Sequence, residues 1–387
     1  MNNVRMVKLG DLCEINPRAP KLTDETLISF VSMSDLSSSK ARTISETSRP
    51  YHEVKKSYTG FQDQDILIAK ITPCWENIKI GIANIKNNFG FGSTEFHVIR
   101  ASDEVTRRYL LHFLRNTHVN LQGKLRMTGS GGQKRVPAKF FEDLQVPLPS
   151  LEEQKRIVSI LDKAKSIQEA RERQLAALDE LAITIFQETI SSTDFTYMTL
   201  DQICGAKGRY GANVPSQDYK VDLPRYIRIT DILSDGSLSK KPKSPSGTFS
   251  DWEKYFVNSG DLLFARSGAT VGKTYIHRDT SNNYVYAGYL IKYHPDPSIA
   301  IPEFVYRYTQ TPEYDSWVKR AQKAVAQPNI NAKQYGSDLM IPVPDLKIQH
   351  ELIKKIDSVE SEKALVREHL KVSQDIFSFL QSNLFTH

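Results

Sequence analysis

The segment EDLQVPLPSLEEQ, at residues 142–154, decides the fold because the chain contains it twice. Its second copy is SDLMIPVPDLKIQ, at residues 337–349, and the offset of 195 positions is close to half of the 387 residues. Solenoid repeats are far shorter, about 20 to 50 residues. Two copies of this length predict a duplicated domain. The positions that keep their residue type include Asp143, Pro147, Pro149, Leu151 and Gln154, which correspond to Asp338, Pro342, Pro344, Leu346 and Gln349.

Segments upstream repeat with nearly the same offset. DILIAK at 65–70 corresponds to DLLFAR at 261–266, and Lys79 corresponds to Lys273. A chain of about 390 residues is long enough for two or three domains. We therefore expect two similar globular halves.

Each half shows patterns of both strand and helix. Strand-like runs open at Asp65, Glu95, Asp261 and Tyr289, and residues 107–116 have helical spacing. The predicted class is α+β, with two homologous mixed α/β domains. Long polar loops lie between the strands, and loops of this length are often functional.

A long helix is expected after each proline-containing segment. Alternating prolines favour an extended edge strand, and the apolar spacing then changes to steps of three and four. Each helix could pack on its own domain, but two similar helices at equivalent positions favour pairing with each other. The predicted seams are Ile157, Ile160, Ala164, Ile167, Arg171, Gln174, Leu178, Leu181 and Ile185, and Ile356, Val359, Lys363, Val366, Leu370, Ser373, Phe377, Leu380 and Leu384. The expected boundaries are a first domain at 1–150, a central helix at 151–192, a second domain at 193–345 and a C-terminal helix at 346–387.

Composition limits the class of protein. Lys and Arg outnumber Asp and Glu by 51 to 45, and the excess lies in the two globular halves, which suits a polyanion partner without proving one. The sequence shows neither a signal peptide nor an apolar run of about 20 residues, so we expect a cytoplasmic protein. Cys13, Cys74 and Cys204 are too few for a disulfide framework and are expected to be small core residues.

Catalytic motifs are weak. GATVGKT at 268–274 resembles a phosphate-binding loop, but three residues separate Gly268 from Gly272 where four are required. Asp143, Glu153 and Lys155 could serve a metal-dependent nuclease, yet Ile348 and His350 occupy the second copy's equivalents of Glu153 and Lys155. We expect the chain to be non-catalytic.

The repeat order and three motifs resemble the specificity subunit of type I restriction-modification systems. The motifs are DILIAKITPCWENIK at 65–79, GDLLFARSGATVGK at 260–273 and TGSGGQKRVPAKFFEDLQVPLPSLEEQ at 128–154. The resemblance covers essentially the whole chain. One departure is Ile348-Gln349, where the first half has Glu153-Gln154.

The resemblance implies a DNA reader within a larger enzyme that defends against foreign DNA. Each target recognition domain would read half of a split site in double-stranded DNA, and the two long helices would form an antiparallel coiled coil with pseudo-two-fold symmetry. Two modification subunits would supply adenine methylation with S-adenosylmethionine, and a restriction subunit would supply ATP- and Mg²⁺-dependent cleavage. The chain itself would hold no cofactor or metal.

DNA-contacting side chains are expected in corresponding loops of the two halves. Such side chains donate to guanine, pair with adenine or hold phosphates. Glycines near Ser130 would permit close approach to a backbone. The first-half candidates are Lys70, Thr72, Trp75, Asn77, Lys79, Arg126, Ser130, Gln133, Lys134 and Arg135. The second-half candidates are Arg209, Tyr210, Arg266, Ser267, Thr270, Lys273, Lys323, Gln327, Asn329 and Asn331.

Two other classes of function stay open from the sequence. An autonomous DNA-binding regulator would bind its site tightly without partners. A nuclease or NTPase would cleave DNA or hydrolyse nucleotide as the isolated chain.

Overall fold

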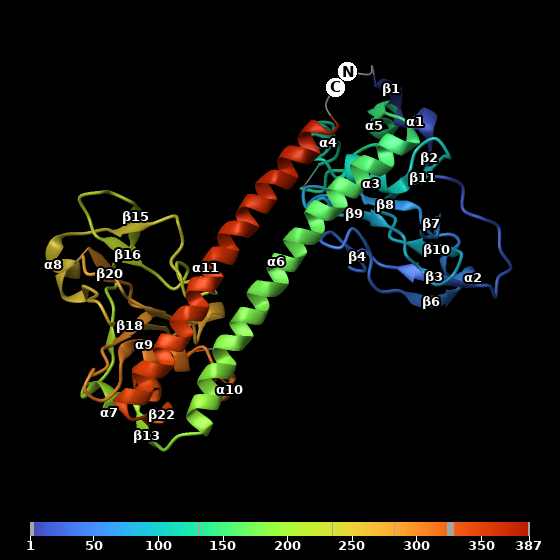
Figure 1. The fold of residues 1–387 in the computed structure, drawn as a ribbon. Helices are drawn as coiled ribbons and strands as arrows, with labels where there is room; N and C mark the ends of the chain where they lie inside the picture. Colours follow the sequence, from blue (N-terminus) through green and yellow to red (C-terminus); the bar gives the residue numbers. More distant parts are fainter. Residues whose placement is uncertain (1–3, 131, 234, 282, 323–328, 386–387) are drawn as a thin grey trace. The chain divides into compact units, whose positions relative to one another are not determined.

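The computed structural model describes residues 4–130, 132–233, 235–281, 283–322 and 329–385. Contacts divide the chain into two units, and each unit contains one half of the repeat together with part of both long helices (Figure 1). Unit 1 comprises Met1–Glu172 and Glu368–His387, and unit 2 comprises Arg173–Arg367. The mixed α/β class expected from the sequence is confirmed in both units.

Unit 1 contains a six-stranded sheet in the order β2-β11-β8-β9-β5-β4, a four-stranded sheet in the order β6-β3-β10-β7, and the pair β1-β12. Its elements before the first long helix are β1 (Arg5–Lys8), α1 (Leu9–Leu12), β2 (Cys13–Ile15), β3 (Leu27–Val31), β4 (Leu36–Ser37), β5 (Arg42–Thr43), β6 (Thr47–Pro50), α2 (Tyr51–Val54), β7 (Thr59–Gln62), β8 (Ile66–Ala69), β9 (Ile80–Ile82), β10 (Phe89–Gly92), β11 (Phe96–Ala101), α3 (Arg107–Leu114), α4 (Thr117–Leu125), α5 (Ala138–Asp143) and β12 (Gln145–Leu148).

Unit 2 contains a four-stranded sheet in the order β14-β21-β18-β19 and the pairs β13-β22, β15-β17 and β16-β20. Its elements between the long helices are β13 (Phe195–Thr199), α7 (Leu200–Cys204), β14 (Arg209–Tyr210), β15 (Ser216–Asp218), β16 (Arg225–Ile227), β17 (Lys243–Pro245), α8 (Phe249–Trp252), the 3-10 turn η1 (Glu253–Tyr255), β18 (Leu262–Ala265), the 3-10 turn η2 (Gly268–Thr270), β19 (Thr274–Ile276), β20 (Tyr284–Tyr286), β21 (Leu290–Tyr293), α9 (Pro302–Tyr308), α10 (Pro312–Gln322), the π turn η3 (Gln334–Asp338) and β22 (Met340–Pro344).

Three antiparallel strands at equivalent positions form the centre of each repeat. In unit 1, β8 lies between β9 and β11, and in unit 2, β18 lies between β19 and β21. All four residues of β8 and of β18 are buried, which explains why these runs are apolar without alternation. The proline-containing strands β12 and β22 each pair with a single strand, as the ring nitrogen of proline requires.

One glutamine of the repeat is buried in each unit, Gln154 in unit 1 and Gln349 in unit 2. The side-chain amide of Gln154 donates to Glu104 O and Pro149 O, and its oxygen accepts from Thr106 N. Gln349 makes the same three bonds with Ile299 O, Pro344 O and Ile301 N. Both side chains are fully buried. This repeated glutamine therefore ties the start of each long helix to the loop before α3 or α9.

The repeated aspartates have a similar structural role. Asp65 accepts from Gln62 N and from the guanidinium of Arg100, and Asp261 accepts from Asn258 N. Lys292 Nζ lies 3.1 Å from Asp261 Oδ2. Each carboxylate is buried and holds the turn that begins the central strand.

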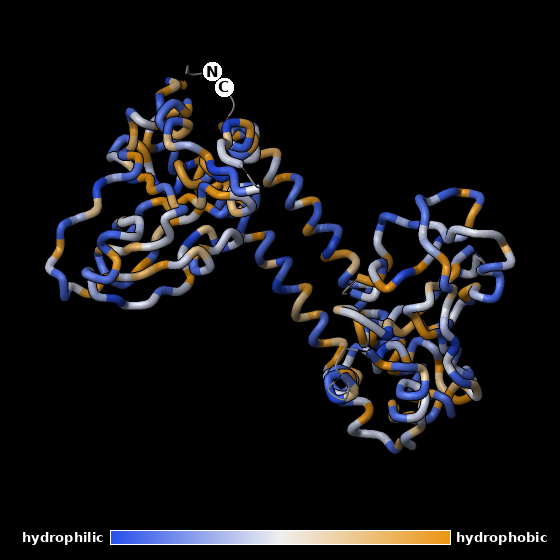
Figure 2. The backbone as a smooth tube through the Cα atoms, turned by 180° about the vertical axis from the view of Figure 1, so that it is seen from behind, coloured by the Kyte–Doolittle hydropathy of each residue, from blue (hydrophilic) through white to orange (hydrophobic). Residues whose placement is uncertain are grey.

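The long helices are α6 (Leu151–Ser191) and α11 (Leu346–Asn383). Polar and apolar residues alternate along both helices (Figure 2). The predicted stripe on α11 is confirmed over its first part, because Ile356, Val359, Lys363 and Val366 are buried.

On α6 the predicted seam was wrong at Ile167 and Leu181, which are exposed. The buried face instead follows Ile157, Leu161 and Gln168. Gln168 is polar and was not counted in the apolar pattern, although its amide donates to Ser373 O on α11. The buried face of α6 therefore includes the polar Gln168 in place of the neighbouring apolar Ile167.

Within each unit the two helices pack antiparallel and also pack on the domain. In unit 1, Gln168 contacts Ser373, while Leu161 shares a hydrophobic cluster with Leu380 and Leu384. In unit 2, the ammonium of Lys363 lies 2.6 Å from the Asp179 carboxylate, and Phe186 packs with Ile356. Both packing alternatives raised by the sequence are thus combined. No helix of the described residues is long and apolar enough to span a membrane.

Candidate nucleic-acid interface

In the first repeat, the segment after β8 and the loop 126–135 come together. Thr72 N donates to Lys134 O at 3.0 Å, and Thr72 Oγ1 donates to Gly132 O at 2.7 Å. Lys134 N donates back to Thr72 Oγ1 at 3.2 Å, and Val136 N donates to Lys70 O at 2.9 Å. Two predicted segments that lie about 60 residues apart therefore form one surface.

Most first-half candidates are accessible on this surface. Asn77, Arg126, Ser130, Gln133 and Lys134 are exposed. Lys70, Thr72 and Lys79 are partly buried. The Arg126 guanidinium lies 5.5 Å from the centre of the Phe140 ring. Lysine, arginine and amide groups in this arrangement can contact both phosphates and base edges.

Arg135 is already paired within the protein. Its Nη2 donates to Glu95 Oε1 at 2.7 Å, and its Nε donates to Glu95 Oε2 at 2.9 Å. Hydrogen bonding from Arg135 holds the pKa of Glu95 below its ordinary value. The charge of Arg135 is therefore balanced by Glu95, and the pair holds the loop in place. Lys70 and Lys134 are the better candidates for contact with DNA.

Trp75, which the sequence suggested as a DNA contact, is not available for one. Its side chain is fully buried, its Nε1 donates to Asn120 O, and its ring packs edge-on against Phe140 and Phe141. A Cβ atom at Gly123 would clash with the indole. The indole is a core group, which fits the large apolar area of tryptophan.

The second repeat presents its candidates through the same backbone pairing. Ile330 N donates to Arg266 O at 2.9 Å, as Val136 N does to Lys70 O, and Ser267 bridges Asn329 as Ile71 bridges Arg135. Arg266 N donates to Tyr289 O, as Lys70 N does to Glu95 O. The positions of Lys70, Glu95 and Arg135 therefore correspond to Arg266, Tyr289 and Asn329.

Arg266 lies at the centre of the second surface. Its guanidinium lies 4.6 Å from the centre of the Tyr210 ring, and its Nε lies 3.4 Å from Asn329 Oδ1. The Tyr210 hydroxyl accepts from Ala332 N at 3.0 Å, which fixes the ring. Ring and amide thus orient the guanidinium, and the ring face suits the cation electrostatically.

The remaining second-half candidates have different surroundings. Arg209 is exposed beside Tyr210 on β14, and Thr270 Oγ1 donates to Ser267 O. Lys273 Nζ donates to Ile232 O, so the segment that resembles a phosphate-binding loop places this ammonium against the protein itself. Asn331 Oδ1 accepts from Gln334 N, the backbone amide that opens the turn η3. Lys323 and Gln327 lie outside the described residues.

One surface residue was missed in the sequence. The Tyr289 side chain is 60% exposed beside Arg266, and its carbonyl accepts from Arg266 N. Tyr289 directly precedes the apolar strand β21, and this position was the available signal, although the sequence alone does not separate Tyr289 from the strand. An exposed tyrosine can stack on a base or donate to a phosphate.

The two carboxylates that suggested a nuclease form ion pairs within the protein. Asp143 lies 3.2 Å from Lys139 Nζ, and Glu153 accepts two hydrogen bonds from Arg156. Among the described residues, no group of three or more His, Cys, Asp or Glu side chains could hold a metal ion. Burial raises the pKa of the Cys13 and Cys204 thiols to about 12, so both are protonated at neutral pH.

A family model described as the type I restriction modification DNA specificity domain matches residues 1–179 and again residues 193–372. The chain is similar to the specificity subunits of two type I restriction enzymes of Escherichia coli. Identity to the EcoAI subunit is 42% over 174 residues, covering 44% of this chain and 30% of that protein. Identity to the EcoEI subunit is 41% over 176 residues, covering 45% and 30%. The chain thus spans about 30% of the length of these relatives.

Solved structures share the fold. A chain from work on complex assembly and conformational transition of the type I R-M system matches with a TM-score of 0.67 and 17% identity, covering 100% of this chain and 98% of that one. The type I restriction-modification S subunit from M. genitalium matches with a TM-score of 0.55 and 12% identity, with the same coverage. Since both copies of the repeat match one domain model, the chain belongs to the type I restriction-modification DNA specificity family.

Proposed function

We propose that the chain reads a bipartite site in double-stranded DNA, one half-site with each repeat, and directs adenine methylation by partner subunits. One observation carries this proposal: a single backbone arrangement presents different side chains in the two repeats. Lys70, Glu95 and Arg135 are replaced by Arg266, Tyr289 and Asn329 on the same hydrogen-bonded frame. A constant frame with variable side chains suits two readers of different sequences.

The proposed organisation keeps recognition domains at 1–150 and 193–345, separated by spacer helices at 151–192 and 346–387. Helix α6 has 41 residues and α11 has 38. At about 1.5 Å per residue, such helices are roughly 60 Å long. This length is sufficient to separate two half-sites along one duplex.

Inserting one heptad into both spacer helices is expected to lengthen the gap by about three base pairs. Seven residues add about 10.5 Å of helix, and one base pair occupies about 3.4 Å. The measurement is sequencing of the methylated sites. Changed half-sequences with an unchanged gap would contradict the spacer role.

The proposed partners are two modification subunits and one restriction subunit. Adenine methylation would use S-adenosylmethionine held by the modification subunits, and cleavage of unmethylated DNA would use ATP and Mg²⁺ held by the restriction subunit. The specificity subunit would contribute only recognition. We place this complex in the cytoplasm.

An exposed apolar face on α11 suits a modification subunit. Val372, Ile376 and Phe379 follow steps of four and three, so they share one side of the helix, and Phe379 is 67% exposed. Replacing Phe379 with lysine is expected to weaken assembly by about tenfold, because truncating a central aromatic residue typically costs more than 1 kcal/mol. Titration of the modification subunit measures it. Ser378→Lys, which changes an exposed neighbour on another side of the helix, is the matched control. Equal affinities for the two variants would remove this face from the interface.

Reconstitution tests the proposed function. The purified chain is expected to bind DNA weakly alone and to confer methylation of one split sequence when mixed with the modification subunit. Tight, site-specific binding without partners would indicate an autonomous regulator. Nucleotide hydrolysis or DNA cleavage by the isolated chain would indicate a catalytic role. Methylation of all sequences alike would overturn the proposal.

A further inference from the structure

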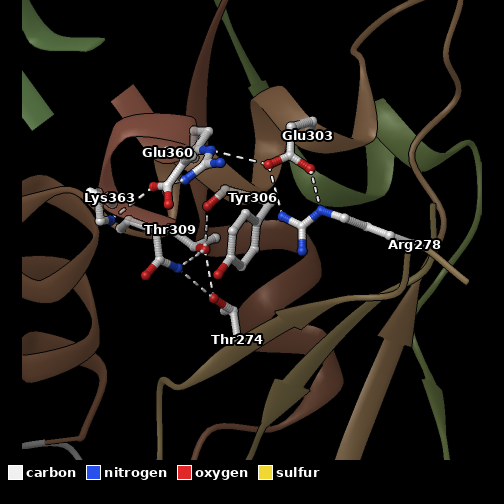
Figure 3. Close-up of polar contacts among 9 residues, drawn as sticks. Thr274, Arg278, Glu303, Tyr306, Thr309, Glu360 and Lys363 are labelled. Atoms are coloured by element: carbon white, nitrogen blue, oxygen red, sulfur yellow. Dashed lines mark hydrogen bonds and ion pairs between the residues drawn. The ribbon is translucent and has the colours of Figure 1, made fainter. Parts of the chain in front are cut away.

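Six side chains of alternating charge connect the second recognition domain with both long helices inside unit 2. Figure 3 shows this row from Arg278 to Lys363. We call this row the ion-pair relay. It begins after β19, passes through α9, and ends on α11 and α6. Its members, in order, are Arg278, Glu303, Arg307, Glu360, Lys363 and Asp179.

The relay begins with a forked pair on the recognition domain. Arg278 Nε donates to Glu303 Oε2 at 3.1 Å, and its Nη2 donates to Glu303 Oε1 at 2.9 Å. Arg307 Nε lies 3.0 Å from the same Glu303 Oε1. The Tyr306 ring centre lies 5.1 Å from the Arg278 guanidinium and 5.6 Å from that of Arg307. Glu303 is therefore shared by two guanidinium groups that also flank one ring.

The relay then crosses to the helices. Arg307 Nη1 and Lys363 Nζ each donate to Glu360 Oε1 at 2.9 Å. Lys363 Nζ also lies 2.6 Å from Asp179 Oδ1 on α6, and its side chain is only 8% exposed. Burial alone would raise the pKa of Glu360, but Lys363 and Arg307 hold that pKa below its ordinary value. The carboxylate therefore stays charged where three helices meet.

A neutral set of hydrogen bonds fixes α9 to the same sheet. Thr274 Oγ1 on β19 lies 2.7 Å from Thr309 Oγ1, and Thr309 Oγ1 donates to Tyr306 O at 2.6 Å. Gln310 Nε2 donates to both threonine hydroxyls at 3.0 Å. These bonds join the end of α9 to strand β19 of the four-stranded sheet. If α9 moved relative to α6 and α11, the sheet would move with it.

In the part of the first repeat that the structure describes, this relay is absent. Its residues at the positions of Arg307, Glu360 and Lys363, 195 positions earlier, are His112, Lys165 and Gln168. There, His112 Nε2 lies 2.8 Å from Asp162 Oδ1, and Gln168 contacts a backbone carbonyl. The duplicated frame therefore carries the relay in one copy only.

The physical properties of buried ion pairs suggest what the relay contributes. Desolvation offsets most of their attraction, so neutral residues of equal volume often leave stability unchanged. Their geometry is nevertheless directional, because each charge accepts only a narrow set of partner positions. A relay of this kind contributes orientation more than stability.

We propose that the ion-pair relay is a positioning device, which fixes how the second recognition domain sits on α6 and α11 and thereby the gap that the subunit accepts. This inference rests on the proposed reading of a bipartite site. One extra base pair moves a half-site by about 3.4 Å and rotates it by roughly 35° about the duplex axis. A domain held by the relay cannot follow that movement, whereas a released domain can.

The test uses the full chain assembled with its modification subunit. Methylation is measured on duplexes that carry the wild-type half-sequences with the native gap and with gaps one base pair shorter or longer. Lys363→Met removes the link to α6 at similar side-chain volume. It is expected to lower the preference for the native gap by about tenfold, which corresponds to 1.4 kcal/mol, with the half-sequences unchanged.

Comparison variants separate positioning from general loss of structure. Lys363→Arg keeps the charge and should keep the strict gap. Lys355→Met makes the same chemical change at an exposed position of α11 and should behave as wild type. If Lys363→Met fails to assemble, Glu360→Gln interrupts the relay at its centre and is expected to relax the gap in the same way.

The outcomes are distinguishable. Relaxed gap preference in Lys363→Met or Glu360→Gln, with Lys355→Met strict, supports the relay. A strict gap in variants that assemble and methylate overturns it while the proposed function stands. A wild-type complex that methylates no split sequence overturns the proposed function and this inference with it.

Discussion

Replacing Arg266 with alanine is expected to lower methylation governed by the second half-site by about 10- to 100-fold, with recognition of the first half-site unchanged. A well-placed arginine contact to a base discriminates by about 1 to 3 kcal/mol, and each 1.4 kcal/mol is about tenfold. Tyr210 and Asn329 already hold the guanidinium in place. The side chain therefore loses little conformational freedom on binding, which places the expected effect toward the upper end of this range.

Two further variants decide what Arg266 contacts. Arg266→Lys keeps the charge but loses the planar fork, so a base-reading role predicts a large loss of sequence preference and a phosphate-contacting role predicts a small one. Lys254→Ala removes an exposed charge on η1 that is not among the candidate residues, and should leave methylation unaltered. Kinetics on duplexes mutated in one half-site at a time provide the measurement. If Arg266→Ala is as active as wild type at every salt concentration, the residue does not touch DNA.

Much of the fold could be predicted from the sequence because the repeat fixes which segments are equivalent. The runs opening at Asp65 and Asp261 form the central strands β8 and β18, and each proline-containing segment leads into a long helix. The first part of the predicted stripe on α11, from Ile356 to Val366, is also confirmed. These predictions rest on local periodicity, which a sequence displays directly.

The errors arise where burial depends on residues that are distant in the chain. Trp75 lies in a loop next to polar residues in the sequence. It is buried by Asn120, Gly123 and Phe140, which lie more than 40 positions further along the chain. The seam of α6 was displaced because Gln168 is buried against a carbonyl more than 200 positions away. Apolar counting cannot recognise a polar residue that satisfies its hydrogen bonds internally.

The candidate surface was predicted only in part for the same reason. The sequence indicated the loop containing Arg135, but Glu95 neutralises this arginine from 40 positions away. Arg266 and Tyr210 were both expected to contact DNA, yet their stacking joins segments more than 50 residues apart. A sequence shows which residue types are present. Contacts within the folded chain decide which of these side chains remain free to bind a ligand.

Gln349→Leu is expected to reduce the free energy of unfolding of unit 2 by about 3 kcal/mol. The substitution removes one acceptor and two donated hydrogen bonds, and each buried group left without a partner costs about 1 to 3 kcal/mol. Added apolar contact by leucine offsets part of this cost. Urea unfolding followed by tryptophan fluorescence is suitable, because Trp252 and Trp317 belong to unit 2.

The matched control is Gln374→Leu, the same substitution at an exposed position of α11, which should change the unfolding free energy by less than about 0.5 kcal/mol. Gln154→Leu should destabilise unit 1 by an amount similar to Gln349→Leu in unit 2, because the three hydrogen bonds are the same. Equal stability of Gln349→Leu and Gln374→Leu would show that the amide is dispensable. The repeated glutamine would then have no structural role at the start of the long helix. A measured loss for both glutamine variants would show that the two copies share one structural frame, whereas the positions of Lys70 and Arg266 on that frame differ. This is the difference that the proposed reading of two half-sites requires.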